Sequence, residues 1–200
     1  MTNFTTYYPS MHRPSKISII CPKCSSHAQF NFSISRTADR IDRPYFDKSK
    51  SFDTEYVKIR KGQWNYRVWH NPGLGTPIEN LEDLPESYKP IFSYQKCTAN
   101  AENRGVVTCI NCGLRRRHKL AWPQDAYFNT EYKGHALWAY NREMASILVE
   151  YLKSPERKKH KFFRVGPQGS WSWLRNLPKI FQSKKARPHV VKKLEKLLAL

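Results

Sequence analysis

Two cysteine pairs constrain this chain more than any other feature of its sequence. Each pair has two intervening residues, giving Cys21 with Cys24 and Cys109 with Cys112. This spacing places two thiolates on one tight turn, and two such turns supply four sulfur ligands to one tetrahedral zinc ion at about 2.3 Å. Gly113 follows the second pair, where the turn favours a positive φ, and Ser25 holds the equivalent position after the first. The sequence therefore predicts one structural Zn²⁺ per chain.

The separation of the two pairs indicates a long insertion. Positions 25 to 108, which are 84 residues, lie between Cys24 and Cys109, against roughly 15 to 20 in a compact zinc finger. Closing this longer loop costs only about 1.5 kcal/mol more, whereas a structural zinc site supplies on the order of 10 kcal/mol. Ordinary buried thiols or two disulfides are the alternatives to a shared ion. The fifth cysteine, Cys97, is interpreted as an inert buried thiol, because no redox or catalytic motif surrounds it.

The charge of the chain points to a polyanionic partner. Its 200 residues include 35 Lys or Arg and 16 Asp or Glu, a formal net charge of +19. Nucleic acid, either DNA or RNA, is the leading partner, and an anionic membrane surface is the second. No apolar run approaches the ~18 residues of a membrane span, and no secretory signal precedes the first pair. We therefore expect a reducing, cytoplasmic location, where paired cysteines bind metal.

The order of the segments predicts an α+β fold. We expect a flexible lead-in over residues 1–15, a zinc-ribbon domain over 16–133 with a β-rich insertion at 36–105, and a helical basic region over 134–200. Strands are predicted at 16–20 and 27–35 around the first pair, and a hairpin at 54–60 and 63–70. An irregular connection is expected over 123–134. Helices are predicted at 135–153, from its apolar spacing, and at 188–200.

The strand leaving the second pair is the first candidate surface for phosphate contacts. It carries Arg115, Arg116, Arg117 and Lys119, and a rigid zinc turn would hold these cations in place at little ordering cost. A solvated strand face is the alternative. The last 50 residues hold 14 Lys or Arg and two Glu, and extend the prediction to a second set of residues: Arg157, Lys158, Lys159, Lys161, Lys184, Lys185 and Arg187.

Aromatic residues of the hairpin offer a further hypothesis. Trp64 and Tyr66 alternate along the second run, close to Lys58, Arg60 and Lys61, and such a mixture could stack on bases while the cations meet phosphates. Aromatic residues also dominate ordinary sheet cores, and this interpretation is the stronger one.

The C-terminal helix and the absence of catalytic motifs set the remaining alternatives. The apolar face of the helix could dock on its own domain, which is favoured, or bind a partner protein or an anionic membrane. The sequence has no His-Glu-x-x-His motif, nucleophile elbow or phosphate loop. A non-enzymatic binding module is therefore predicted. A protein-binding subunit of a larger (ribonucleo)protein assembly is the alternative, and a metal-dependent nuclease is less favoured.

Two stretches besides the cysteines suggest a family. Residues 134–143, Gly-His-Ala-Leu-Trp-Ala-Tyr-Asn-Arg-Glu, and 174–179, Leu-Arg-Asn-Leu-Pro-Lys, resemble segments of bacterial proteins of the TFIIB-type zinc-ribbon group. The two cysteine pairs resemble the ligands of that broad group as well. The resemblance implies metal binding and a zinc-ribbon fold, and it implies no settled activity.

Overall fold

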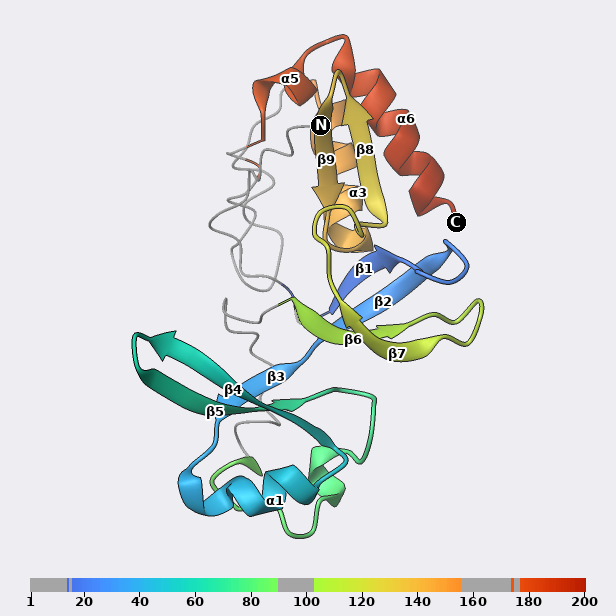
Figure 1. Ribbon diagram of the computed structural model, residues 1–200. Coiled ribbons are helices and arrows are strands. Elements are labelled where there is room, and N and C mark those ends of the chain that lie inside the picture. The colour runs from blue at the N-terminus through green and yellow to red at the C-terminus, as the bar shows by residue number, and fades with distance from the viewer. Residues whose placement is uncertain (1–13, 15, 90–102, 156–173, 175–176) are drawn as a thin grey trace. The chain divides into compact units, whose positions relative to one another are not determined.

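The computed structural model describes residues 14, 16–89, 103–155, 174 and 177–200, and it divides into two compact units (Figure 1). One unit consists of residues 21–121, and the other combines 1–20 with 122–200. The chain therefore passes between the units at Ile20 and again at Trp122. The unit of residues 1–20 and 122–200 includes a strand that precedes the first cysteine pair, and the domain boundaries predicted from the sequence stay a prediction.

Three neighbouring antiparallel strands of one sheet carry both cysteine pairs. Their order is β2 (His27–Phe32), β6 (Arg104–Thr108) and β7 (Arg115–Lys119). Gln29 of β2 lies opposite Thr108 of β6, and Thr108 lies opposite Arg115 of β7. Phe30 and Val107 are fully buried on one face of this sheet. The alternation predicted for residues 27–35 is confirmed as far as Phe32, where β2 ends.

A second sheet forms the insertion and has its own core. It consists of β3 (Ile34–Thr37), β5 (Gln63–His70) and β4 (Phe52–Arg60), in that order, with the short helix α1 (Arg43–Lys48) packed against it (Figure 1). The predicted hairpin is confirmed. Single turns η1 (Arg40–Asp42) and η2 (Ile78–Asn80) complete this part. Its core comprises Ala38, Phe46, Phe52, Tyr66, Val68, Ile78, Leu84 and Tyr88.

The other unit packs helices on a short hairpin. Strands β8 (Phe128–Tyr132) and β9 (His135–Ala139) pair with each other, and β1 (Lys16–Ile20) adds a bridge from Ile19 to Ala126. Helices α3 (Arg142–Lys153) and α6 (Ala186–Leu198) pack with this hairpin and with each other, and α5 (Lys179–Gln182) packs against α6. The apolar face of α6, through Val190 and Leu194, is buried within its own unit.

The helix predicted over residues 135–153 is wrong in its first third. Residues 135–139 form β9, and the helix begins only at Arg142, where the Asn141 side chain accepts a hydrogen bond from the Met144 amide. Gly134 has a φ of +76° and turns the chain from β8 into β9. The connection expected over residues 123–134 is not wholly irregular either, because β8 lies within it.

Among the residues that the structure describes, none of the helices has the length and apolar character needed to cross a membrane.

Candidate metal centre

The four paired cysteines meet at one point in the unit of residues 21–121. The Sγ atoms of Cys21 and Cys112 are 3.7 Å apart, those of Cys24 and Cys109 are 3.6 Å apart, and all four lie within 4.8 Å of one another. A disulfide would bring two sulfurs to about 2.05 Å, so all four are free thiols. The prediction that the two pairs converge on one site is confirmed.

The two cysteine turns have the same backbone construction. The amide of Cys21 donates to the carbonyl of Ser26 at 2.8 Å, and the amide of Cys109 donates to the carbonyl of Leu114 at 2.8 Å, five residues ahead in each case. Ser25 and Gly113, which directly follow the second cysteine of each pair, have φ values of +60° and +67°. The positive φ expected at both positions is therefore confirmed, although only one of them is glycine.

Strand pairing explains how cysteines so far apart in sequence come together. The first turn immediately precedes β2, and the second connects β6 to β7. Because β2 pairs with β6 in register, the start of β2 is held beside the end of β6, and the two turns face each other. The intervening chain leaves this sheet after Phe32 and returns at Arg104, so the second sheet is inserted without disturbing the cysteine cluster.

The surroundings of the sulfurs favour thiolates at the first turn. Hydrogen bonds from the amide and hydroxyl of Ser26, together with the side-chain amide of Asn111, lower the pKa of Cys24 to about 5. Burial opposes ionisation of Cys21, but the backbone amides of Cys24 and Lys23 outweigh it and lower its pKa. Burial raises the pKa of Cys112 to about 12, and the neighbouring sulfurs add to this effect.

The cluster fits a tetrahedral metal ion. Four sulfurs that each lie about 2.3 Å from a central ion stand roughly 3.8 Å apart, close to the separations of 3.6 and 3.7 Å found for two of the pairs here. A divalent cation would also supply the positive charge that stabilises four neighbouring thiolates. Within the described residues, no other group of three or more His, Cys, Asp or Glu side chains is close enough to share an ion.

The predicted phosphate-binding cations of β7 all have exposed side chains, but they point to two faces of the sheet. Register places Arg104 beside Lys119 and Val106 beside Arg117, so Arg115, Arg117 and Lys119 share a face with Arg104, while Arg116 lies on the other. The guanidinium of Arg115 lies against Gly73, since a Cβ atom added there would be 2.8 Å from it.

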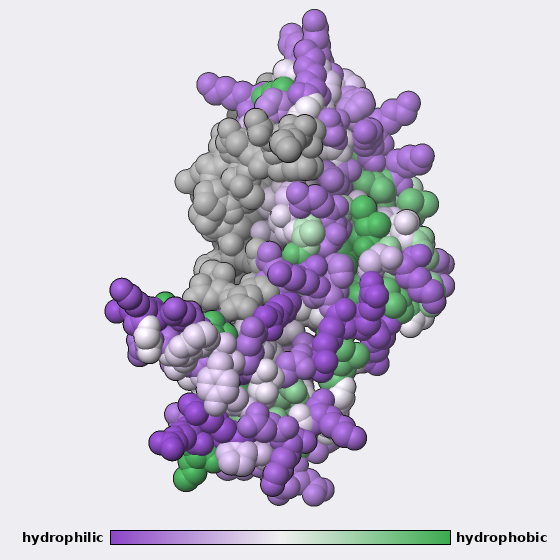
Figure 2. All heavy atoms as spheres, viewed as in Figure 1, coloured by the Kyte–Doolittle hydropathy of each residue, from purple (hydrophilic) through white to green (hydrophobic). Residues whose placement is uncertain are grey.

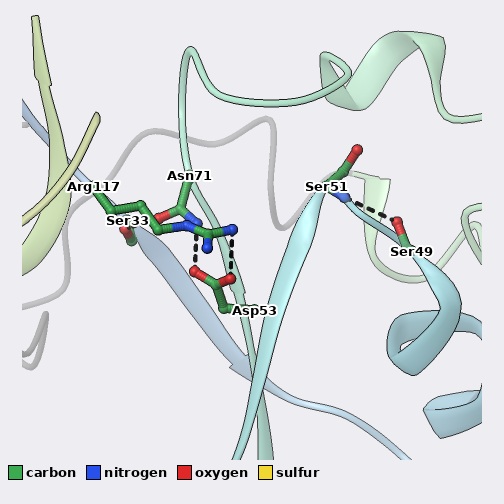
Figure 3. Close-up of polar contacts among 6 residues, drawn as sticks. All are labelled: Ser33, Ser49, Ser51, Asp53, Asn71 and Arg117. Atoms are coloured by element: carbon green, nitrogen blue, oxygen red, sulfur yellow. Dashed lines mark hydrogen bonds and ion pairs between the residues drawn. The ribbon is translucent and has the colours of Figure 1, made fainter. Parts of the chain in front are cut away.

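Arg117 of β7 and Arg104 of β6, which share a face, are engaged by carboxylates of β4. Arg117 forms an ion pair with Asp53 at 2.6 Å (Figure 3). Arg104 forms one with Glu55 at 2.7 Å. Asp53 also accepts a hydrogen bond from Asn71 at 2.7 Å, and Asn71 accepts one from Ser33 at 2.6 Å. These contacts link the sheet that carries the cysteines to the inserted sheet.

The same contacts border a cavity of about 360 Å³ between the two sheets, and its lining includes Trp69, Asp53 and Lys119. The guanidinium of Arg104 lies 5.0 Å from the centre of the Trp69 ring, which is 1% exposed. This network was not predicted from the sequence. Alternate acidic residues at positions 53 and 55 of the hairpin were the available signal, because they place two carboxylates on one face of a strand.

The structure describes only some of the other predicted cations. Lys184 and Lys185 are exposed just before α6, and Arg187 in its first turn is half-buried. The remaining set, Arg157, Lys158, Lys159 and Lys161, lies outside the described residues, as does Cys97. In the hairpin, Tyr66 belongs to the core as the stronger interpretation predicted, whereas Trp64 is exposed.

Comparisons of the chain with protein-family models, with curated proteins and with solved structures each gave no match, so the resemblance to the TFIIB-type zinc-ribbon group stays a prediction.

Proposed function

We propose that this protein is a zinc-stabilised nucleic-acid-binding module. The observation that carries this proposal is the position of β7: a strand with four exposed cations leaves the metal-binding turn directly, and the turn fixes where it starts. Cations held on a rigid strand meet phosphates with little loss of conformational entropy. The formal net charge of +19 supplies a long-range attraction to the same partner.

Zinc is the metal that this site fits best. Four thiolates in a closed tetrahedral arrangement are typical of structural zinc sites, and the two turns, each leading into a strand, are the parts of a zinc ribbon. All four ligands come from the protein, which leaves no open position for a reacting water. When bound, zinc would contribute folding free energy, and Cys21, Cys24, Cys109 and Cys112 would hold it.

The cations available for phosphate contacts are those without a carboxylate partner. Arg115, Arg116 and Lys119 form no ion pair among the described residues, while Arg117 is paired with Asp53. Lys184 and Lys185 add exposed charge at the start of α6. The proposal therefore assigns the main phosphate contacts on β7 to Arg115 and Lys119 on one face of the strand, with Arg116 available on the other.

The metal is tested by elemental analysis of the purified chain. We expect one zinc per chain, colourless solutions, and loss of the metal in a Cys112→Ser variant. A visible absorption band would identify iron, which four thiolates also bind. A variant Cys112→Ser that keeps full zinc and full stability would contradict the assignment.

Nucleic-acid binding is tested with labelled DNA and RNA of equal length, followed by fluorescence anisotropy at several salt concentrations. If six or more phosphates are contacted, affinity falls by about 10³ to 10⁵ between 50 and 200 mM salt. The double variant Arg115→Ala, Lys119→Ala, which removes two cations of one face of β7, should reduce the salt slope by about 2. The double variant Lys48→Ala, Lys50→Ala, which removes two exposed cations at and just after the end of α1, serves as the matched control.

Other outcomes distinguish the alternatives. Zinc without binding to DNA or RNA would favour a protein-binding subunit of a larger assembly. Degradation of the labelled strand in Mg²⁺ or Mn²⁺ would replace the binding module by a nuclease.

A further inference from the structure

We propose that the outer end of the β4–β5 hairpin is a stacking surface for the bases of single-stranded nucleic acid. This surface, called the hairpin platform below, consists of Tyr56, Lys58 and Trp64 from the hairpin and Arg43 from α1. The inference rests on the nucleic-acid-binding function proposed above and adds to it the class of nucleic acid and the groups that contact the bases.

Register places the members of the platform on one face of the hairpin. Tyr56 lies opposite Tyr66, and Lys58 lies opposite Trp64. Nearer the root of the hairpin this same face forms the core, where Tyr66 is only 3% exposed. Towards the turn the face leaves the core behind, and Tyr56 and Trp64 are 55% and 57% exposed. Two aromatic residues therefore occupy diagonal positions on one face of the hairpin, and more than half of each is exposed.

Folding of the hairpin alone does not account for these two rings. Aromatic residues favour strands because they pack on their cross-strand neighbours, and the ring of Tyr56 does pack edge-on against Tyr66, with centroids 5.0 Å apart. More than half of each exposed side chain still lies in water, so the area that would stabilise the fold by burial is not used. Adjacent exposed aromatic residues of this kind mark interaction surfaces.

Cations surround the two rings. The guanidinium carbon of Arg43 lies 5.5 Å from the centre of the Tyr56 ring, and Arg43 donates a hydrogen bond to the Tyr56 hydroxyl at 3.4 Å. The ammonium of Lys58 lies 5.9 Å from the centre of the Trp64 ring. Arg60 and Lys61 are exposed at the turn beyond them. None of these four cations forms an ion pair with a carboxylate in the part of the chain that the structure describes.

The acidic residues of the hairpin lie away from the platform. Glu55 projects from the opposite face and pairs with Arg104. Asp47 of α1 accepts hydrogen bonds from Thr54 and Tyr66, closer to the root. Figure 2 shows the hairpin end, at the left, as strongly hydrophilic residues beside others of near-neutral hydropathy, the class to which Trp and Tyr belong. The charge of the platform is therefore positive, which suits a polyanion.

Aromatic rings next to cations select single strands over duplexes. In a duplex both faces of every base are already stacked, so a protein ring reaches no base without breaking pairs. An unpaired base presents its face, and stacking on Trp or Tyr contributes about 1–3 kcal/mol per base, with little dependence on sequence. Cations beside the rings then meet the phosphates that join the stacked bases.

The test measures the binding of the full chain, with zinc bound, to a fluorescein-labelled 20-residue oligothymidylate, an oligouridylate, a duplex of the same length, and a strand of abasic sites. We expect Trp64→Ala to weaken binding to both intact single strands by about 5- to 150-fold, the range that stacking of one base implies. The salt slope should stay the same, because no phosphate contact is lost. Duplex and abasic strands should bind the variant and the unaltered protein equally.

Two further variants test whether the aromatic ring at position 64 is responsible for the effect. Trp64→Phe keeps a ring and should restore most of the affinity, while Ile59→Ala, which removes an exposed apolar side chain of the same hairpin, should have no effect. Equal binding of intact and abasic strands by the unaltered protein, or an affinity unchanged in Trp64→Ala, would overturn the platform and leave salt-dependent phosphate binding in place. Absence of any binding to nucleic acid would overturn both this inference and the proposed function.

Discussion

At the scale of single residues, the two cysteine turns differ in one position that carries a conformational cost. Both turns need a residue with positive φ directly after their second cysteine, and they use Ser25 and Gly113 for it. A side chain in this conformation costs roughly 1–2 kcal/mol, which glycine avoids. The two turns therefore make the same hydrogen bonds, but the positive φ costs conformational free energy only at Ser25.

This difference predicts how a substitution in each turn changes the free energy of unfolding. Gly113→Ala should lower the free energy of unfolding by about 1 kcal/mol, since no atom lies within 4 Å of the added Cβ and only the backbone is strained. Ser25→Gly should leave stability unchanged or raise it slightly, because relief of strain offsets the added freedom of the unfolded chain. Urea unfolding of zinc-loaded protein measures both. Equal destabilisation by the two substitutions would contradict this account.

A second prediction concerns His70, which is 6% exposed at the end of β5. Burial lowers the pKa of His70, so the folded protein favours the neutral ring, while the unfolded chain binds a proton near the ordinary pKa of about 6.5. The stability that depends on this neutral ring is fully present above pH ~6.5 and is lost as the pH falls towards the lower pKa of the folded state. Acidification from pH 7.5 to 5.5 should therefore destabilise the protein.

The measurement compares wild-type protein with His70→Gln, which cannot titrate, by urea unfolding across this pH range with zinc in excess. Protonation of the cysteines affects both proteins alike, so the difference between their unfolding free energies isolates His70. We expect this difference to shrink as the pH falls. A difference that is constant with pH would show that His70 does not titrate differently in the two states.

At the scale of elements, sequence patterns predicted strands better than they predicted which strands pair. The alternation over residues 27–35 identified a strand, yet the chain changes sheets near Ser33, whose amide donates to the carbonyl of Arg104 at 2.9 Å. Period-two alternation is the same whichever partner a strand has, so it cannot locate such a change. The helix predicted from residue 135 failed for a related reason, since a short stretch with the buried apolar side chains Leu137, Trp138 and Ala139 suits either a strand or a helix.

The candidate metal site was predictable because its information is local. The spacing within each pair and the residue after it define a turn, and two matched turns imply one ion. The contacts of Arg117 and Arg104 with Asp53 and Glu55 were not predictable in this way, because they join strands that only the tertiary fold brings together. A positive charge in a sequence thus predicts a negatively charged partner, but it does not show whether that partner is another molecule or a carboxylate of the same chain.

These ion pairs lead to a prediction for the strand β7. Asp53→Asn removes the carboxylate that holds Arg117, so the guanidinium becomes available for a phosphate. We expect nucleic-acid affinity to rise a few-fold and the salt slope to increase by about 1. Both partners are partly exposed, at 58% and 35%, so the free energy of unfolding should fall by no more than about 1 kcal/mol.

Glu86→Gln is the matched control, because it also removes one negative charge but breaks only a local pair with Lys89. Anisotropy titrations of the two variants against the same strand separate the local effect from the change in net charge. Equal affinity gains in both variants, or a loss in Asp53→Asn, would argue that Arg117 does not face the bound nucleic acid.

At the scale of the whole molecule, the cysteine cluster and the three C-terminal helices that the structure describes belong to different units. The cluster lies in residues 21–121, while α3, α5 and α6 lie in the other unit, which buries its own apolar core through residues such as Phe128, Leu148 and Leu194. A structural zinc site contributes on the order of 10 kcal/mol to the folding of the segment that binds it. Loss of metal should therefore act on one unit and spare the other.

We accordingly expect a strong chelator to unfold residues 21–121 while the helical signal in far-ultraviolet circular dichroism is largely kept. Amide hydrogen exchange should show lost protection in β2, β6 and β7 and retained protection in α3 and α6. Cys112→Ser should reproduce this state without chelator. Cys97→Ser should bind zinc normally, since the four clustered thiolates already complete a tetrahedral shell.

Loss of protection in α3 and α6 at the same chelator concentration would mean that the two units fold as one cooperative body. Retained protection in β2 and β6 would mean that their pairing is stable without the metal.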